Sequence, residues 1–181
     1  NNNSEDVIKL INKLEYFLLE EVKFNDGVGA QFIYTRAFNN CTSLSKVTLP
    51  DSNFDFEEKV FNNCNSLEEI VFNQNTNIVS NHGTLFGNCT NLTKFTVNPN
   101  NSFYSSNTCL LTNKSGNEII LAASGYDYTN WVIPSNITLI GEAAFSGISK
   151  LYNIVINENI TVNVNENEIT LTRKNDNYKN F

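Results

Sequence analysis

The chain has 181 residues, with 12 Lys and Arg against 19 Asp and Glu, and a formal charge of −7. This length allows one domain with a moderate core, and no apolar run approaches the ~20 residues of a membrane-spanning helix. Nucleic acid is excluded as a partner, because binding to phosphates needs clustered Lys and Arg that the sequence lacks. The chain begins without a Met, and we expect that any leader is missing from it.

The first predicted element is an amphipathic helix over residues 4–22. Ser4 suits the N-cap, and Glu5 and Asp6 suit the first turn. One face of this helix is apolar and consists of Val7, Leu10, Ile11, Leu14, Phe17 and Leu18. We interpret residues 1–27 as a cap on the structure that follows. The alternative is a helix that belongs to an upstream domain.

Four related stretches follow the helix. They read AFNNCTSLSKVTLP (37–50), VFNNCNSLEEIVFN (60–73), LFGNCTNLTKFTVN (85–98) and AFSGISKLYNIVIN (144–157). Counted from the Phe of each stretch, a Cys follows at +3 (Ile in the fourth), a Leu at +6, and apolar residues at +9 and +11. Repeats with a period of about 20–50 residues are typical of solenoids, in which each unit is too thin to bury its own apolar face.

The offsets also predict the structure of one repeat. The spacing of three suits a turn of α- or 3₁₀-helix, and the +9 and +11 positions suit a strand with one buried face. The FNN and FGN segments place Asn or Gly where the turn must end, a position that tolerates the left-handed conformation. Stacked repeats should therefore form a parallel sheet, with ladders of identical side chains inside.

Two irregular segments complete the chain. Residues 98–134 contain a β-hairpin that we expect to turn at 114–117, and their last strand, 131–134, aligns with 47–50. Near the C-terminus, apolar residues alternate over 160–173 on both sides of an Asn-Glu-Asn turn, which predicts a capping hairpin before a polar tail.

These repeats resemble the BspA-type leucine-rich repeat family, whose units read roughly I-G-x-x-A-F-x-x-C-x-x-L-x-x-I-x-L-P. The fit is best at IGEAAF (140–145) and at 37–50, and Asn81 departs from it in a unit lengthened by two residues. The resemblance implies an α/β repeat fold, a short right-handed solenoid with its parallel sheet on the concave face. We assign residues 1–27 to a helical cap, 28–160 to the solenoid with its hairpin unit at about 98–134, and 161–181 to a capping hairpin and tail.

Residues that could carry chemistry favour structural roles. The repeated Cys41, Cys64 and Cys89 point inward and lack the spacing of a zinc site, and Cys109 is interpreted as a lone thiol. His82 lies in a bulged turn with no sign of a nucleophile beside it. The acidic segment with Asp51, Asp55, Glu57 and Glu58 lacks the pattern of a calcium loop. We therefore predict no metal, no cofactor and no enzymatic activity.

The remaining candidate for function is a binding surface on the outside of the solenoid. On the strands, the residues between the buried ones face solvent and form two columns. The first column is Lys46, Glu69, Lys94, Asn130 and Asn153, and the second is Thr48, Val71, Thr96, Val132 and Val155. Alternating Lys and Glu should pair across the sheet. The second column is either simply favourable for strands or a contact surface for an extended partner.

Aromatic residues flank the hairpin unit. If Phe103, Tyr104, Tyr126 and Tyr128 are exposed, they could anchor an interface. A carbohydrate-binding module is one alternative, with Tyr104, Tyr126, Tyr128 and Trp131 as stacking platforms, although Trp131 aligns with the inward Val47.

The resemblance leads to a hypothesis about function. Similar proteins are secreted or cell-surface adhesins of host-associated microbes that bind extracellular-matrix proteins such as fibronectin and fibrinogen. The resemblance thus implies a secreted or cell-surface interaction module that binds a protein, and the two columns suggest the exposed side of the sheet as its contact surface. A second alternative is a structural spacer within a larger surface protein.

Overall fold

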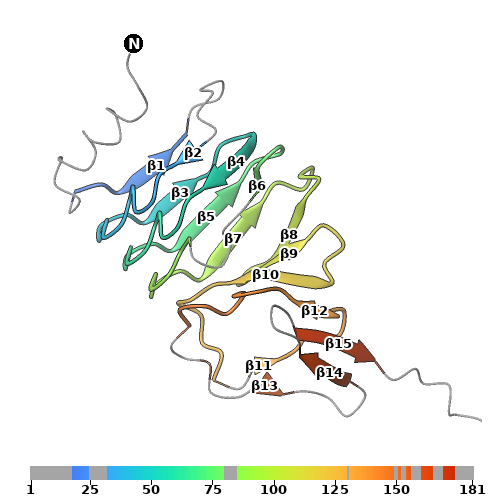
Figure 1. The fold of residues 1–181 in the computed structure, drawn as a ribbon. Coiled ribbons are helices and arrows are strands. Elements are labelled where there is room, and N and C mark those ends of the chain that lie inside the picture. Colours follow the sequence, from blue (N-terminus) through green and yellow to red (C-terminus); the bar gives the residue numbers. More distant parts are fainter. Residues whose placement is uncertain are drawn as a thin grey trace, which may run out of the picture.

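The structure is a computed structural model that describes residues 18–24, 32–79, 85–129, 131–148, 151, 154–155, 160–164 and 169–173. Figure 1 shows a series of stacked coils that places strands from distant parts of the sequence side by side. Within the described residues there are strands and turns but no helix, and hence no helix that could span a membrane.

Two parallel sheets line the first half of the molecule. One contains β1 (Glu21–Lys23), β3 (Lys46–Thr48), β5 (Glu69–Phe72) and β7 (Lys94–Val97), paired in that order. The other contains β2 (Phe32–Ile33), β4 (Asn53–Phe56) and β6 (Asn77–Ile78). We call this half, residues 18–97, the N-terminal stack.

The second half, residues 104–173, forms the C-terminal stack. Its larger sheet has the order β14 (Ile160–Val164), β15 (Ile169–Arg173), β12 (Leu139–Ile140), β10 (Glu118–Ala122), β9 (Leu110–Asn113) and β8 (Tyr104–Asn107). A small parallel sheet contains β11 (Trp131–Val132) and β13 (Ile154–Val155). The predicted hairpin with its turn at 114–117 joins β9 to β10, and the predicted C-terminal hairpin joins β14 to β15.

The repeat offsets fix the register of the N-terminal stack. The residues at +9 face one another across successive parallel strands, with Val47 paired to Ile70 and Ile70 to Phe95. The +3 and +6 residues of these three coils, three Cys and three Leu, are fully or almost fully buried. The sequence prediction of a parallel solenoid with inward ladders is therefore confirmed.

The Phe side chains form a stacked column, which we call the Phe ladder. The ring of Phe61 lies 5.1 Å from that of Phe38 at an interplanar angle of 4°, and 5.5 Å from that of Phe86 at 14°. Beside it, the Cys64 thiol donates to the carbonyl of Phe38, and the Cys89 thiol donates to that of Phe61, both at 3.1 Å. The ladders thus bury apolar surface and satisfy backbone carbonyls together.

The turns before the strands are sharper than a helical turn. Asn40, Asn63 and Asn88 have φ values of 62°, 60° and 57°, and Gly147 has 77° at the same position of the last repeat. The predicted left-handed position is thus confirmed. Four residues earlier, Arg36 is also left-handed, with φ at 61°. Two left-handed residues so close together prevent a helix from continuing, so the expected helical turn is a run of β-turns instead.

The prediction of a helix over 4–22 is wrong where the structure describes it. Glu21–Lys23 is strand β1, and its Val22 pairs with Val47 in parallel register. Leu19 and Phe24 pack against the core, whereas Leu18 is 76% exposed. Pairing with β3 outweighs the helical periodicity in this part of the chain, because it completes the inward ladders. Residues 4–17 of the predicted helix lie outside the described residues.

A further repeat lies within the irregular segment. Ala122 N–H donates to Ala144 O, as Phe61 N–H donates to Leu85 O, so that Ala122 occupies a Phe position. The following offsets are filled by Gly125, Tyr128, Trp131 and Ile133. The predicted alignment of 131–134 with 47–50 agrees with this register, in which Trp131 pairs with Ile154.

The inserted hairpin separates two hydrophobic cores. On β9, Leu111 belongs to the core of the N-terminal stack, and its neighbour Leu110 belongs to that of the C-terminal stack. On β10, Leu121 belongs to the core of the N-terminal stack and Ile119 to that of the C-terminal stack. These strands are therefore apolar on both faces, as strands buried between two layers are.

Candidate interaction surfaces

The solvent-facing side of β1-β3-β5-β7, here called the sheet face, carries a network of ion pairs. Glu69 lies between two lysines, 3.2 Å from Lys46 Nζ and 2.8 Å from Lys94 Nζ. Thr96 donates its hydroxyl to the same carboxylate. The hydrogen bond from Lys94, followed by that from Thr96, lowers the pKa of Glu69 to about 2. The predicted pairing of Lys and Glu across the strands is confirmed.

The second column lies beside this network. Thr48, Val71 and Thr96 are in register on adjacent strands, and each is half-buried. Val132 and Val155 pair with each other on β11 and β13, a separate sheet, and are 57% and 46% exposed. Of the eight column residues that the structure describes, six therefore lie together on one sheet and the other two lie apart. Asn130 and Asn153 lie outside the described residues.

The four predicted aromatic anchors separate into two groups. Tyr104 is 5% exposed, and its hydroxyl donates to the carbonyl of Ile78. Tyr128 is fully buried, with its hydroxyl donating to Cys109 O. Both are core residues, so the prediction that they anchor a partner is wrong. Phe103 and Tyr126 are 42% and 39% exposed, and their role as anchors stays a prediction.

Trp131 is engaged by neighbouring aromatic rings. Its ring lies 5.9 Å from Tyr128 at 85° and 5.2 Å from Phe145 at 57°. A side chain held this way packs the C-terminal core rather than offering a flat platform to a sugar. Of the four platforms proposed for a carbohydrate-binding module, only Tyr126 is well exposed.

The acidic segment is used to join coils. Asp51 accepts hydrogen bonds from the backbone and side-chain amides of Asn75, and Glu57 accepts from the backbone and hydroxyl of Thr35. The hydrogen bond from the Thr35 backbone is the main reason why the pKa of Glu57 is lowered. In the described part of the chain, no group of three or more His, Cys, Asp or Glu is placed to hold a metal. His82 lies outside that part.

The repeated cysteines are free thiols inside the core. For Cys64, a hydrogen bond with Cys41 lowers the pKa, but a hydrogen bond with Cys89 and burial raise it, with a net rise to about 12. Hydrogen bonding to Cys64, followed by burial, raises the pKa of the Cys41 thiol as well. Cys41 and Cys64 are therefore protonated at neutral pH and unreactive, which agrees with a packing role.

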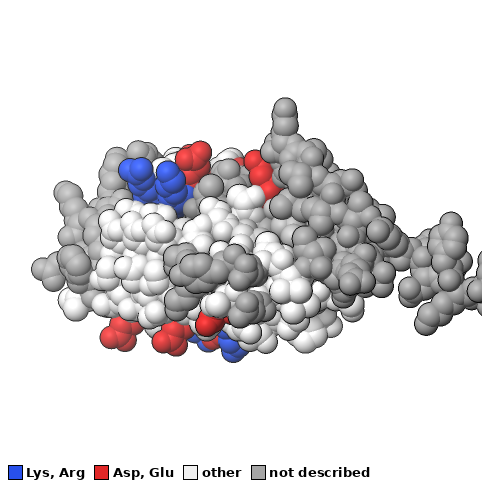
Figure 2. Space-filling model, turned by 90° about the horizontal axis from the view of Figure 1, so that it is seen from below, with Lys and Arg blue, Asp and Glu red and all other residues white. Residues whose placement is uncertain are grey.

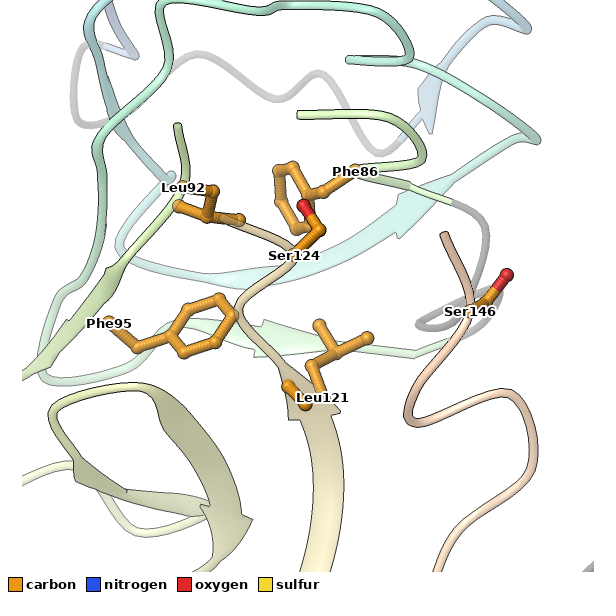
Figure 3. A pocket seen from close by; sticks show the side chains of 7 residues that line it. Phe86, Leu92, Phe95, Leu121, Ser124 and Ser146 are labelled. Carbon is orange, nitrogen blue, oxygen red and sulfur yellow. The ribbon is translucent and has the colours of Figure 1, made fainter. Parts of the chain in front are cut away.

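A small cavity marks the junction of the two stacks (Figure 3). It is lined by Phe86, Leu92, Phe95, Leu121, Ala122, Ser124 and Ser146. Its volume of about 10 Å³ holds at most one water. The cavity borders Ala122, the residue that replaces a Phe in its repeat, so we attribute it to an interrupted ladder. It is too small to bind a substrate.

One set of polar residues that are exposed or half-buried was not predicted from the sequence, whose candidates lay at the buried offsets and on the strands. The +2, +4 and +5 positions of the first three repeats face solvent on the turns. They are Asn40, Asn63 and Asn88 at +2, Thr42, Asn65 and Thr90 at +4, and Ser43, Ser66 and Asn91 at +5. We call these nine residues the turn face. Their shared polarity is visible in the aligned repeats and could have identified them.

Comparison with known proteins identifies the family of these repeats. A family model described as a BspA type leucine-rich repeat region matches six copies over residues 13–125 and 121–168. The chain belongs to this family. BspA-type repeats are a protein-interaction fold, and the model's six copies are consistent with the additional repeat at Ala122. A search of curated proteins finds no match.

The chain is also similar to a solved structure. This is a leucine-rich repeat protein from Eubacterium ventriosum ATCC 27560, with 20% sequence identity and a TM-score of 0.48. The match covers 79% of this chain and 49% of that one, so this chain spans about half the length of its neighbour.

Proposed function

We propose that this BspA-type chain is a non-enzymatic interaction module that binds a protein through its sheet face. The observation that supports this most directly is the regular array on β3, β5 and β7. There, the ion-paired column and the uncharged column run side by side in exact strand register. Repeat sheets of this kind suit extended partners, because every strand presents the same positions to solvent.

The proposed partner is an extracellular-matrix protein of a host, and the proposed location is the cell surface or the extracellular space. Both follow from the family, whose resemblance implies adhesins of host-associated microbes. The ion pairs favour this face as a contact site, since Lys46, Glu69 and Lys94 are already held in place and lose little conformational freedom on binding.

Biolayer interferometry over immobilised fibronectin, fibrinogen and collagen tests the proposal. The variant Thr48→Glu/Val71→Glu/Thr96→Glu should lose binding, because it places three unpaired charges at the contact. A matched control places three glutamates on the same repeats but on the turns, at Thr42, Asn65 and Thr90. The control should bind like the wild type.

Folding of each variant is checked by circular dichroism and thermal unfolding, and the single variant Val71→Glu serves if the triple variant unfolds. Binding that survives in a folded sheet-face variant would exclude this face. If the wild type binds none of the three proteins, adhesion to matrix is wrong and a spacer role is favoured.

A further inference from the structure

The outer side of the second parallel sheet carries exposed hydrophobic side chains. Along β2, β4 and β6, buried residues that pack into the core alternate with residues that face solvent. On the solvent side, Phe32 is 53% exposed and Val79, directly after β6, is 61% exposed. We call this side of β2-β4-β6 the second-sheet face.

The strand register joins these side chains into one column. Phe32 pairs with Asp55 on the neighbouring strand. The parallel register of β4 and β6 places Val79 on the other side of Asp55, and Val79 N–H donates to Phe54 O at 2.9 Å. The column therefore reads apolar, acidic, apolar, with one residue per strand at a spacing of about 4.8 Å.

Two aromatic side chains border this column. Tyr34 lies two residues after Phe32, on the same side of the chain, and is 45% exposed. Phe103 is 42% exposed and lies near β6, because the hydroxyl of the following Tyr104 donates to Ile78 O at 3.0 Å. Single exposed hydrophobic residues are ordinary, but several gathered on one side of a sheet mark an interaction surface.

The charged groups of this face are mainly acidic. The Glu57 carboxylate accepts from the backbone and the hydroxyl of Thr35, both neutral groups, at 2.7 Å each, and so keeps its negative charge. Residues 51–58 hold four carboxylates, and the adjacent Arg36 and Lys59 balance only two of them. The whole chain carries a formal charge of −7, which attracts cationic partners.

These features select a class of partner. Carboxylates repel nucleic acid and anionic lipid surfaces. Figure 2 shows charged side chains along two opposite edges of the molecule, with a largely uncharged surface between them. A cationic segment therefore finds its counter-charges at an edge. Exposed aromatic residues beside those charges add the apolar contacts on which protein interfaces depend.

We propose that the second-sheet face binds a basic segment of a partner protein, in which Arg or Lys lies between apolar residues. The apolar side chains of the segment pack on Phe32 and Val79, and the cation between them pairs with Asp55. Arg pairs with a carboxylate through two parallel hydrogen bonds, and the flanking apolar contacts exclude water from them. This surface is separate from the sheet face, and its ligand does not depend on binding there.

The test is fluorescence anisotropy of labelled peptides titrated with the full chain. The probe is a peptide of four Arg-Leu-Ser repeats, and two matched peptides replace either every Arg by Glu or every Leu by Ser. The key variant is Phe32→Ser/Val79→Ser, which removes apolar groups that are already exposed and contribute little to folding. The matched control is Val132→Ser/Val155→Ser, which removes two exposed valines paired on β11 and β13.

We expect the Arg-Leu-Ser peptide to bind saturably, and the Phe32→Ser/Val79→Ser variant to bind it about tenfold more weakly. Asp55→Asn should weaken binding by about threefold, and added salt should reduce this difference because it screens the ion pair. The matched control should bind like the wild type. So should the sheet-face variant Thr48→Glu/Val71→Glu/Thr96→Glu, which separates this proposal from binding at the sheet face.

Three results would overturn the proposal. The first is the absence of saturable binding of the Arg-Leu-Ser peptide up to about 1 mM. The second is equal binding of either matched peptide. The third is undiminished binding by a Phe32→Ser/Val79→Ser variant that circular dichroism shows to be folded, with Val79→Ser alone as the replacement if the double variant unfolds.

Discussion

The two stacks bury their aromatic residues in different ways. In the N-terminal stack, Phe38, Phe61 and Phe86 lie face to face at the same offset of successive repeats. In the C-terminal stack, Tyr128 meets both Trp131 and Phe145 edge to face, at 5.9 Å from each. The first arrangement is a column that could be extended by another repeat, and the second is a closed cluster.

One residue lies at the change between these arrangements. Ala122 occupies the Phe position of its repeat, so no ring follows Phe86 in the column. A cavity remains beside Ala122, and Ser124 donates to Cys89 O across the junction. The comparison shows that a solenoid keeps its backbone register through a repeat that has lost its consensus side chains, provided that local contacts replace the ladder.

Removing a ring from the N-terminal stack should have the largest effect. Phe61→Ala would leave a gap in the Phe ladder like the one beside Ala122 at the junction. Inside the N-terminal stack, however, no hydrogen bond like that from Ser124 to Cys89 O would compensate for the missing ring. We expect the free energy of unfolding to fall by about 3–5 kcal/mol, as for other buried Phe→Ala changes. Urea unfolding followed by circular dichroism measures this loss.

The control for this change is Asn65→Ala, an exposed substitution in the same repeat, which should stay within about ±0.5 kcal/mol. Similar small losses for both variants would mean that the Phe ladder does not stabilise the N-terminal stack.

The junction offers the next test. A Cβ built at Gly125 would lie 2.6 Å from the carbonyl oxygen of Thr90 and 2.7 Å from the amide nitrogen of Leu92. Because these are backbone atoms, Gly125→Ala must push the two stacks apart, and we expect a loss of about 1–3 kcal/mol, as for overpacked sites. The fluorescence of Trp131, which reports on the C-terminal core, measures unfolding.

Ser135→Ala, at an exposed turn of the C-terminal stack, should leave that transition unchanged. If Gly125→Ala has the same midpoint as the wild type, the close approach of the two stacks at Gly125 does not contribute to stability.

The sequence predicted the regular part of this fold well because identical offsets recur. Once Phe, Cys and Leu repeat at fixed spacing, the register of the strands follows, and Trp131 could be aligned from the strand alone. The repeat at Ala122 was missed because Ala and Gly replace Phe and Cys there, leaving a pattern too weak to detect. Its backbone hydrogen bonds identify its Phe position.

Other elements were misjudged for different reasons. The stretch around Val22 has helical periodicity, but its strand pairing with Val47 depends on residues far along the chain. The parallel sheet of β2, β4 and β6 was not foreseen, because its strands are only two to four residues long. For the candidate sites, register predicted the contacts of Glu69, whereas the burial of Tyr104 and Tyr128 depends on packing that spacing cannot encode.

The left-handed turns of the N-terminal stack allow a test at smaller scale. Alanine strongly disfavours positive φ, so Asn63→Ala should lower stability by about 1–2 kcal/mol. Asn63→Gly should lower it less, although glycine usually destabilises, because glycine accepts φ near 60°. Paired urea titrations of the two variants give the order, and a less stable glycine variant would show that the side-chain amide matters more than the backbone.

The smallest expected effect concerns the ion pairs that distinguish the sheet face of the N-terminal stack. The pKa of Glu69 is lowered from 4.5 to about 2 in the folded protein, so its contribution to stability is complete above about pH 4.5. That contribution is lost as the pH falls from 4.5 through 2. Because the two lysines are 42% and 53% exposed, solvent weakens these pairs, and we expect at most about 1 kcal/mol.

Urea unfolding of the wild type and Glu69→Gln between pH 7 and pH 2 measures this contribution. The glutamine variant cannot ionise, so the difference between the two proteins should be greatest at neutral pH and should vanish toward pH 2. Added salt at neutral pH should also reduce it, since screening weakens exposed pairs. A difference that stays constant with pH would mean that the shape of Glu69, and not its charge, stabilises the sheet face.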